Sequence, residues 1–150
     1  SIDSFNDEQK LIFVNQILKD FPNAKNTCIA ILGLAFKPET DDVRESPAIA
    51  IVEKLSSYGY QFNAYDPKAM ETFKLSLKKG INIQYCSSSK EALEYADALL
   101  LVTEWQEFQR ISPQELKAFF KGKHIYDGKN IYSPKALKEA GYIYYGIGRS

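Results

Sequence analysis

Two short apolar runs constrain the fold of this chain more than any other feature of its sequence. They are CIAILGL (28–34) and the largely apolar ADALLLV (96–102), and both are far too short to cross a bilayer. Continuous apolar runs of this length are typical of strands that are buried on both faces, as in parallel sheets covered by helices on each side. We therefore expect a layered α/β domain.

Helix-like and strand-like segments alternate along the rest of the chain. Apolar residues with helical spacing cover the first 21 residues and stop at Pro22. Three later helices are predicted to begin at a serine followed by proline, because the hydroxyl caps free N–H groups and proline at the first position loses no hydrogen bond. These starts are Ser46, Ser112 and Ser133. Two more helices are predicted over 68–79 and from the serines at 87–89.

Four further strands complete the pattern. Apolar alternation or short apolar runs predict them at 60–65, 81–85, 124–127 and 142–146. Six strands that alternate with helices favour a Rossmann-like, doubly wound, six-stranded and mostly parallel sheet with helices on both faces, preceded by an N-terminal helix. No repeat or linker divides the sequence, and 150 residues with 45% apolar content fit one domain.

Charge and cysteine content narrow the function classes. Lys plus Arg and Asp plus Glu both count 19, so no long-range field favours nucleic acid or a membrane surface. The acidic start SIDSFNDEQK has no secretion signal, which predicts a cytoplasmic protein. Cys28 and Cys86 lack a C-x-x-C spacing, so we interpret them as buried thiols and expect neither a disulfide framework nor a metal site.

The segment GLAFKPETDDVRES (33–46) follows the first buried strand, where a nucleotide-binding unit would turn directly into a helix. Long loops in compact domains are usually functional or disordered, and the capped exit of this one argues for order. Lys37 and Arg44 are cations suited to phosphate oxygens. The alternative, equally supported by spacing alone, is that both pair with acidic neighbours in 39–45 on a solvated surface.

The other strand ends meet the same crevice, because ligands of such sheets bind beyond the carboxyl ends where the strand order reverses. Lys129 follows the fifth strand, and Glu104 and Trp105 follow the fourth. Asp66 could bind the hydroxyl groups of a ribose, but its place before a proline is better explained by a structural role in a D-P turn. His124 opens its strand at the opposite end, which indicates a structural role.

Together these residues indicate an anion or nucleotide pocket formed by Lys37, Arg44 and Lys129. The fingerprint G-x-G-x-x-G is absent after the first strand, so we expect a main ligand other than NAD. The sequence offers neither a base beside a nucleophile nor paired metal ligands, so it predicts no catalytic set.

Several stretches taken together resemble the C-terminal part of the nucleotide-sugar dehydrogenases, and in particular the UDP-glucose 6-dehydrogenase branch of the UDP-glucose/GDP-mannose dehydrogenase family. The resemblance covers nearly the whole chain in order and spacing. The most specific stretch is GLAFKP with DDVRESPA, while TEWQEF and DGKNIY favour the UDP-glucose branch. The matching stretches are 6–10, 33–48, 65–69, 103–108, 127–132 and 141–149.

The resemblance implies a domain organisation for the complete enzyme. Family members combine an NAD-binding domain, a central helical dimerisation region and a C-terminal UDP-sugar-binding domain. Residues 1–22 would then be the end of the central region with its connecting helix, and 23–150 the UDP-sugar-binding domain. The family oxidises UDP-glucose to UDP-glucuronate by two hydride transfers to NAD through a thioester on a cysteine. That cysteine's motif, G-G-S-C-F-P-K-D, is absent here, so no catalytic residue is expected in this chain.

Position by position, the resemblance implies that Phe36, Lys37 and Lys129 bind the substrate, and that Arg44 reaches the NAD held by the first domain. Lys129 stands where most relatives have arginine, so its single charge lacks the bidentate fork. Phe36 and the Asp41–Asp42 pair would shape the loop. The loop would be long because it spans from the sugar crevice to the cofactor. The complete enzyme would be a homodimer or a higher homo-oligomer.

Two alternatives stay open. The chain could be the same domain of a UDP-N-acetylmannosamine or GDP-mannose dehydrogenase, whose sugar-contacting loops lie mostly outside it. It could also be a non-enzymatic nucleotide-binding module with a receiver-like fold. Against the latter stands the missing acidic cluster at the end of the first strand, which a phospho-acceptor site requires.

Overall fold

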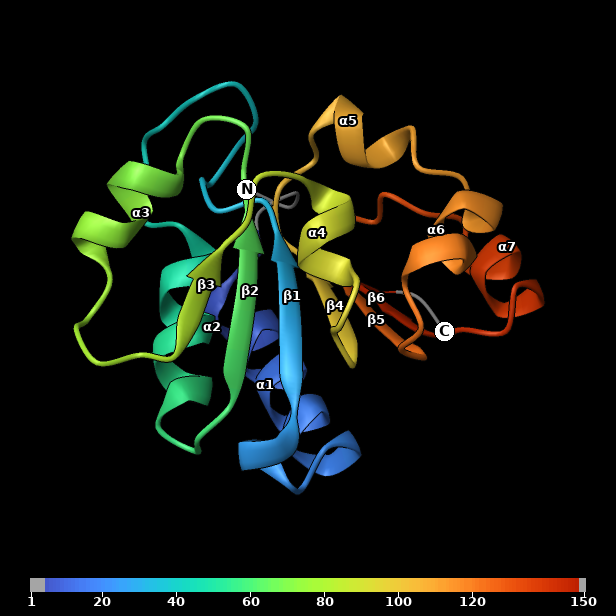
Figure 1. Cartoon of the computed structure of the whole chain (residues 1–150), viewed down its shortest axis with the longest axis horizontal. Coiled ribbons are helices and arrows are strands. Elements are labelled where there is room, and N and C mark those ends of the chain that lie inside the picture. Colours follow the sequence, from blue (N-terminus) through green and yellow to red (C-terminus); the bar gives the residue numbers. More distant parts are fainter. Residues whose placement is uncertain (1–4, 149–150) are drawn as a thin grey trace.

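The six predicted strands form one sheet in the order β3-β2-β1-β4-β5-β6, and every neighbouring pair is parallel (Figure 1). The computed structural model describes residues 5–148. The prediction of a Rossmann-like doubly wound sheet is confirmed, and the sheet is parallel throughout. The strands are β1 (Cys28–Leu32), β2 (Gln61–Tyr65), β3 (Ile83–Tyr85), β4 (Ala98–Leu101), β5 (His124–Asp127) and β6 (Ile143–Gly146).

The helices begin largely where their caps predict. Ser46, Ser112 and Ser133 each accept a hydrogen bond from a first-turn N–H through the side chain, and each precedes a proline. The first helix starts after a capping box between Asn6 and Gln9. The helices are α1 (Asp7–Asp20), the 3-10 turn η1 (Ala24–Asn26), α2 (Pro47–Ser56), α3 (Met70–Ser76), α4 (Ser89–Leu93), α5 (Gln106–Gln109), α6 (Pro113–Phe119) and α7 (Pro134–Glu139).

Several elements differ from the sequence prediction, among them the 3-10 turn η1, which was not predicted, and β3, which begins at Ile83 and not at residue 81. The third helix ends at Ser76 and not at residue 79, because Leu77 is extended and buried while the next N–H, of Lys78, donates to Glu53 Oε2 at 2.9 Å. The single-turn helix α5 was not predicted. The N-terminal helix begins at Asp7, later than predicted, because Asn6 caps it, and residues 1–4 of the predicted range lie outside the described residues.

Alternate residues of the strands pack into two separate hydrophobic cores. In β1, Ile29 and Ile31 pack with α1, α2 and α3, whereas Ala30 and Leu32 pack with the helices from α4 to α7. In β5, Tyr126 joins the first core and Ile125 the second. Figure 1 shows the same layering, with α4 in front of the sheet and α1 behind it. The prediction of helices on both faces is therefore confirmed. Because helices cover the two faces, the ends of the strands are the parts of the sheet that stay accessible.

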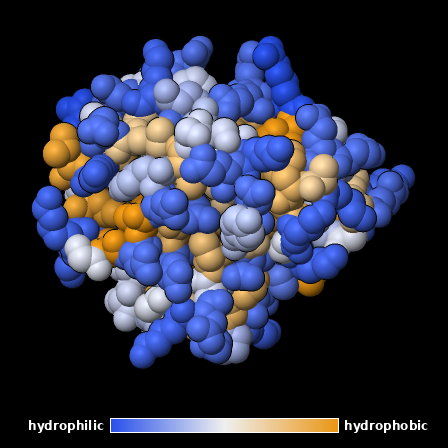
Figure 2. All heavy atoms as spheres, in the orientation of Figure 1, coloured by the Kyte–Doolittle hydropathy of each residue, from blue (hydrophilic) through white to orange (hydrophobic). Residues whose placement is uncertain are grey.

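Polar residues dominate one face of the molecule (Figure 2). The face in Figure 2 is largely hydrophilic, with hydrophobic atoms gathered on its left, over β3 and α3. Leu75 of α3 is 80% exposed. Within residues 5–148, no helix combines the length and apolar character that a membrane crossing requires.

Both cysteines are free thiols that face the interior to different degrees. Cys86 is buried, as predicted, whereas Cys28 is half-buried at the start of β1. Burial, reinforced by the nearby Asp97 carboxylate, raises the pKa of Cys28 to about 11. A thiol with so high a pKa is protonated and a poor nucleophile at neutral pH.

Candidate functional site

The candidate site lies at the carboxyl edge of the sheet, where the strand order reverses between β1 and β4. The chain leaves β1 through Gly33, whose φ is +95° and whose N–H donates to the Tyr65 carbonyl at 2.9 Å. A Cβ at this position would lie 2.5 Å from Cβ of Thr103. Only glycine satisfies both the backbone conformation and the close approach of the segment after β4.

Residues 34 and 35 are held by three buried side chains. Asp66 Oδ2 accepts from the Leu34 N–H at 2.8 Å, Ser46 Oγ donates to the Leu34 carbonyl at 2.5 Å, and Thr103 Oγ1 donates to the Ala35 carbonyl at 2.6 Å. The three side chains are at most 4% exposed. They therefore fix the root of the 33–46 segment, which we call the first-strand loop.

Both carboxylate oxygens of Asp66 accept hydrogen bonds from backbone N–H groups. Oδ1 accepts from the N–H groups of Lys68 and Ala69, both at 2.8 Å. The structure thus agrees with the D-P turn interpretation of this residue. Buried carboxylates need such partners because an unpaired charge is costly away from water.

The tip of the first-strand loop is exposed. Phe36 is 37% exposed, and the Lys37 ammonium lies 5.3 Å from the centre of its ring. Among residues 5–148, no carboxylate lies within ion-pair distance of Lys37. This lysine is therefore not neutralised by a direct ion pair.

Arg44 is placed differently. Its Nε and Nη2 donate to the two oxygens of Asp42 at 3.0 and 2.7 Å, and its side chain is 88% exposed. The hydrogen bonds from Arg44 lower the pKa of Asp42 to about 2. Of the two interpretations of Arg44 from sequence, the pairing with an acidic neighbour is therefore present in this structure.

The segment after β5, which we call the fifth-strand loop (127–132), is held by a second buried carboxylate. Asp127 Oδ1 accepts from the Lys129 N–H at 3.1 Å, and Oδ2 accepts from the Tyr132 N–H at 3.0 Å and the Tyr144 hydroxyl at 2.7 Å. Asn130 has φ +52° and bonds residue 147 through both side-chain atoms. Lys129 thus projects from a tightly bonded loop.

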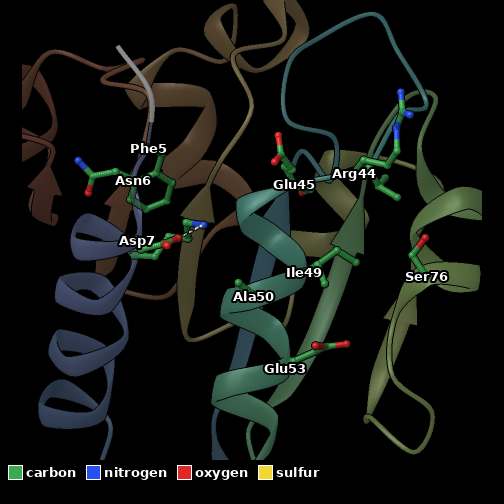
Figure 3. Close-up of a pocket in the computed structure, with 12 residues that line it drawn as sticks. Phe5, Asn6, Asp7, Arg44, Glu45, Ile49, Ala50, Glu53 and Ser76 are labelled. Carbon is green, nitrogen blue, oxygen red and sulfur yellow. Dashed lines mark ion pairs between the residues drawn. The ribbon is translucent and has the colours of Figure 1, made fainter. Parts of the chain in front are cut away.

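The larger of two hollows near these loops measures 650 Å³ and lies between the first turns of α1 and α2 (Figure 3). Its lining includes Phe5, Asn6, Arg44, Ser46 and Glu53. In Figure 3 the Arg44 side chain extends away from both helices, above the start of α2. The hollow is therefore bordered by the first-strand loop but not capped by its guanidinium.

The smaller hollow measures 380 Å³ and lies at the switch point itself. Pro38 and Glu39 line it from the first-strand loop, and Glu104, Trp105 and Gln109 line it from the segment after β4. The predicted position of Glu104 and Trp105 at this rim is confirmed. Lys37 and Lys129 line neither hollow, so the structure does not bring the three predicted cations together around either one.

Sequence reasoning missed the side chains that shape these loops. Asp127, Thr103 and Asn130 were not assigned a positioning role, although the repeated Tyr-Asp at the ends of β2 and β5 is a visible signal. In both places the aspartate accepts backbone N–H groups of the turn that follows. Among residues 5–148, no group of three or more His, Cys, Asp or Glu side chains is arranged to hold a metal ion.

Comparison with known proteins identifies the chain. The UDP binding domain of the UDP-glucose/GDP-mannose dehydrogenase family matches residues 30–134, which include both loops. The chain belongs to this family. The resemblance inferred from the GLAFKP and DDVRESPA stretches is therefore confirmed, and the two loops described above are part of the family's UDP binding domain.

Individual relatives agree with this assignment. A UDP-glucose 6-dehydrogenase of Bacillus subtilis (strain 168), TuaD, is 37% identical over 144 residues, which are 96% of this chain and 31% of that protein. A UDP-glucose dehydrogenase from Pyrobaculum islandicum has a similar structure, with a TM-score of 0.78, 26% identity and coverage of 97% of this chain and 31% of that one. The structure of a UDP-D-ManNAc dehydrogenase from Pyrococcus horikoshii is also similar, with a TM-score of 0.71 and 28% identity. The match covers 93% of this chain and 30% of that one. This member of the family spans about a third of their length.

Proposed function

We propose that this chain is the UDP-sugar-binding part of an NAD-dependent UDP-glucose 6-dehydrogenase, which oxidises UDP-glucose to UDP-glucuronate in two hydride transfers. The observation that carries the proposal is the family match over residues 30–134, together with 37% identity to a protein named UDP-glucose 6-dehydrogenase. On this proposal residues 1–22 form the end of a helical dimerisation region and its connecting helix, and 23–150 form the binding domain. Residues 1–4 and 149–150 of these ranges lie outside the described residues.

In the proposed site Lys37 and Lys129 contact the diphosphate or sugar oxygens, and Phe36 lies beside them. Support comes from their placement on the loops after β1 and β5, and from the absence of an ion-pair partner for either ammonium within residues 5–148. Ammonium groups without a carboxylate partner are available for an anionic ligand.

The hydride acceptor, NAD, is proposed to bind mainly to another domain of the complete enzyme. On this proposal the segment after β1 is not the dinucleotide site, which is supported by its clamped root and by the start of α2 only at Pro47, so that no helix begins directly behind the strand. Arg44 is the one residue proposed to reach the cofactor. It would have to exchange Asp42 for an oxygen of NAD.

Isothermal titration with UDP and thermal unfolding test the proposal. A ligand that binds only the folded state at 100 times its dissociation constant stabilises it by about 2.7 kcal/mol, so millimolar UDP should raise Tm by several degrees. Lys37→Ala and Lys129→Ala should each weaken UDP binding about fivefold. Lys79→Ala is the matched control, because this exposed lysine precedes β3 at the opposite edge of the sheet. No Tm shift with millimolar UDP would contradict the proposal.

The second branch of the family is tested by competition. A structure 28% identical to this chain is that of a UDP-D-ManNAc dehydrogenase, so both branches share this fold. Titration with UDP-glucose, UDP-N-acetylmannosamine and GDP-mannose separates the two uridine branches from the GDP-mannose branch. We expect the two uridine ligands to bind alike and GDP-mannose to bind at least tenfold more weakly. Preferred binding of GDP-mannose would assign the chain to the other branch.

The proposed role of Arg44 needs the complete enzyme. There Arg44→Ala should raise the KM for NAD more than the KM for the UDP-sugar, because the guanidinium is proposed to meet only the cofactor. Equal changes in both constants would show that Arg44 acts on the loop as a whole.

A further inference from the structure

The backbone at Lys129 is fixed from both sides. Its own N–H donates to Asp127 Oδ1 at 3.1 Å. The next residue, Asn130, accepts from the Ile147 N–H at 2.9 Å through Oδ1 and donates to the Ile147 carbonyl at 3.0 Å through Nδ2. We call these two bonds the Asn130–Ile147 clasp. The preceding Gly128 is closely approached by Phe5, since a Cβ there would lie 2.9 Å from the Phe5 ring, so no side chain fits at this position.

The clasp depends on properties that few other side chains combine. Asn130 has φ +52°, a conformation that asparagine tolerates better than most residues with a side chain. Its amide also carries a donor and an acceptor, so it can bond the N–H and C=O of one residue in the way a neighbouring strand would. The clasp thereby extends the pairing of β5 and β6 beyond Asp127 and Gly146, where the strands end.

The clasp joins the loop to Ile147, whose side chain packs against the edge of the first core. Asn130 and Lys129 are half-buried, and Asn130 belongs to neither hydrophobic core. What the clasp fixes is the base of one side chain that carries a charge. An ammonium on four rotatable bonds contacts an anion over a small region only when the backbone beneath it is fixed, and each immobilised side chain costs about 0.5–1.5 kcal/mol of binding.

We propose that Asn130 is a positioning residue for the diphosphate of a nucleotide sugar, and that it acts through Lys129. The inference rests on the proposed function, in which Lys129 contacts that diphosphate. The amide oxygen and one of the two N–H groups of Nδ2 bond Ile147, so on this proposal Asn130 acts by holding the loop and not by binding the ligand.

A double-mutant cycle on UDP affinity tests the proposal in the 150-residue chain. Asn130→Gly removes the clasp without backbone strain, since glycine adopts positive φ freely. We expect it to raise the Kd for UDP about fivefold when Lys129 is present and less than twofold in the Lys129→Ala background, because neighbouring residues that act as a unit are not additive. Asn63→Ala is the matched control: its amide donates to the Ala92 carbonyl at 3.3 Å, away from the loop. It should lower Tm and leave Kd unchanged.

The outcomes separate the inference from the proposed function. If Lys129→Ala leaves UDP affinity unchanged, the proposed role of Lys129 fails, and the inference fails with it. If Lys129→Ala weakens binding while Asn130→Gly does not, only the inference is overturned. A fivefold loss from Asn130→Gly in both backgrounds also overturns it, because Asn130 would then act independently of the ammonium. Coupled losses support it.

Discussion

The two loops that carry the lysines of the proposed site are built in opposite ways. The first-strand loop is clamped at its root and exit by three side chains and in its middle by Thr72, whose hydroxyl donates to the Asp41 carbonyl at 2.5 Å, whereas its tip at Lys37 is exposed. The fifth-strand loop is bonded along its length, so that Lys129 lies directly between two anchored positions. One loop therefore presents its charge on an exposed tip, where we expect more freedom to move, and the other on a base that hydrogen bonds fix.

The difference suggests a division of roles in binding. A fixed ammonium gains affinity because less conformational entropy is lost when the ligand arrives. A movable tip can reach a ligand, or a second partner, that lies away from the sheet edge. Both arrangements depend on a buried aspartate at the end of a strand, which is 0% exposed in each case. The predictions below test where each loop is fixed.

The largest effect is expected at the root of the first-strand loop. In Gly33→Ala the new methyl group would meet Thr103 Cβ at 2.5 Å in a backbone conformation with φ +95°. Strain and overpacking together should lower the free energy of unfolding by about 3–5 kcal/mol.

Gly80→Ala is the matched control for this change. Its φ is +87°, but a Cβ there meets no atom within 4 Å, so only the backbone cost of about 1–2 kcal/mol should appear in urea unfolding. Equal losses for the two variants would show that Thr103 yields easily and that the root is not tightly packed.

Replacing each of the two buried aspartates by asparagine should lower the free energy of unfolding by different amounts. The amide of Asp66→Asn sets an N–H group against the buried Leu34 N–H, which has no route to water, and should cost about 2–3 kcal/mol. In Asp127→Asn the corresponding donor is the part-buried Lys129 N–H, which can turn to solvent, so about 1 kcal/mol is expected. Urea unfolding of both variants measures the difference, and a larger loss at Asp127 would reverse the comparison.

Most of the fold was predictable because its signals are local. The Ser-Pro starts of α2, α6 and α7 fix helix caps within a few residues of sequence, and the apolar runs fix the two buried strands. The early end of α3 was not predictable, because it depends on a contact between Lys78 and Glu53, which lie far apart in the sequence. The single turn of α5 is too short for a periodicity signal.

The site was predictable only in part, for a similar reason. Residue type identified Lys37, Arg44 and Lys129 as cations at strand ends, and the structure confirms that all three follow strands at the carboxyl edge. Their partners depend on rotamers and on loop geometry. The bidentate pairing of Arg44 with Asp42 was one of two interpretations that spacing left open, and the amide clasp of Asn130 has a partner 17 residues away.

A smaller effect should distinguish the fixed lysine from the movable one. Lys129→Arg places a bidentate guanidinium on the fixed loop and should improve UDP affinity about threefold, because two parallel hydrogen bonds form without further ordering of the backbone. Lys37→Arg on the exposed tip should change affinity less than twofold. Titration calorimetry measures both. A larger gain at position 37 would mean that the tip is already ordered before UDP binds.

The smallest effect concerns the exposed pair of Asp42 and Arg44. Because the folded pKa of Asp42 is depressed from 3.8 to about 2, its ionisation stabilises the folded state above pH 4, and this contribution is lost as the pH falls from about 4 to about 2. Asp42→Asn lacks it at every pH. Urea midpoints of the two proteins should therefore differ slightly at pH 6 and converge near pH 2, and the gap should narrow in high salt because the pair is exposed. A gap that persists at pH 2 would mean that the carboxylate's charge is irrelevant. The backbone hydrogen bond from the Arg44 N–H would then order this end of the loop, and the tip would be less movable than the comparison requires.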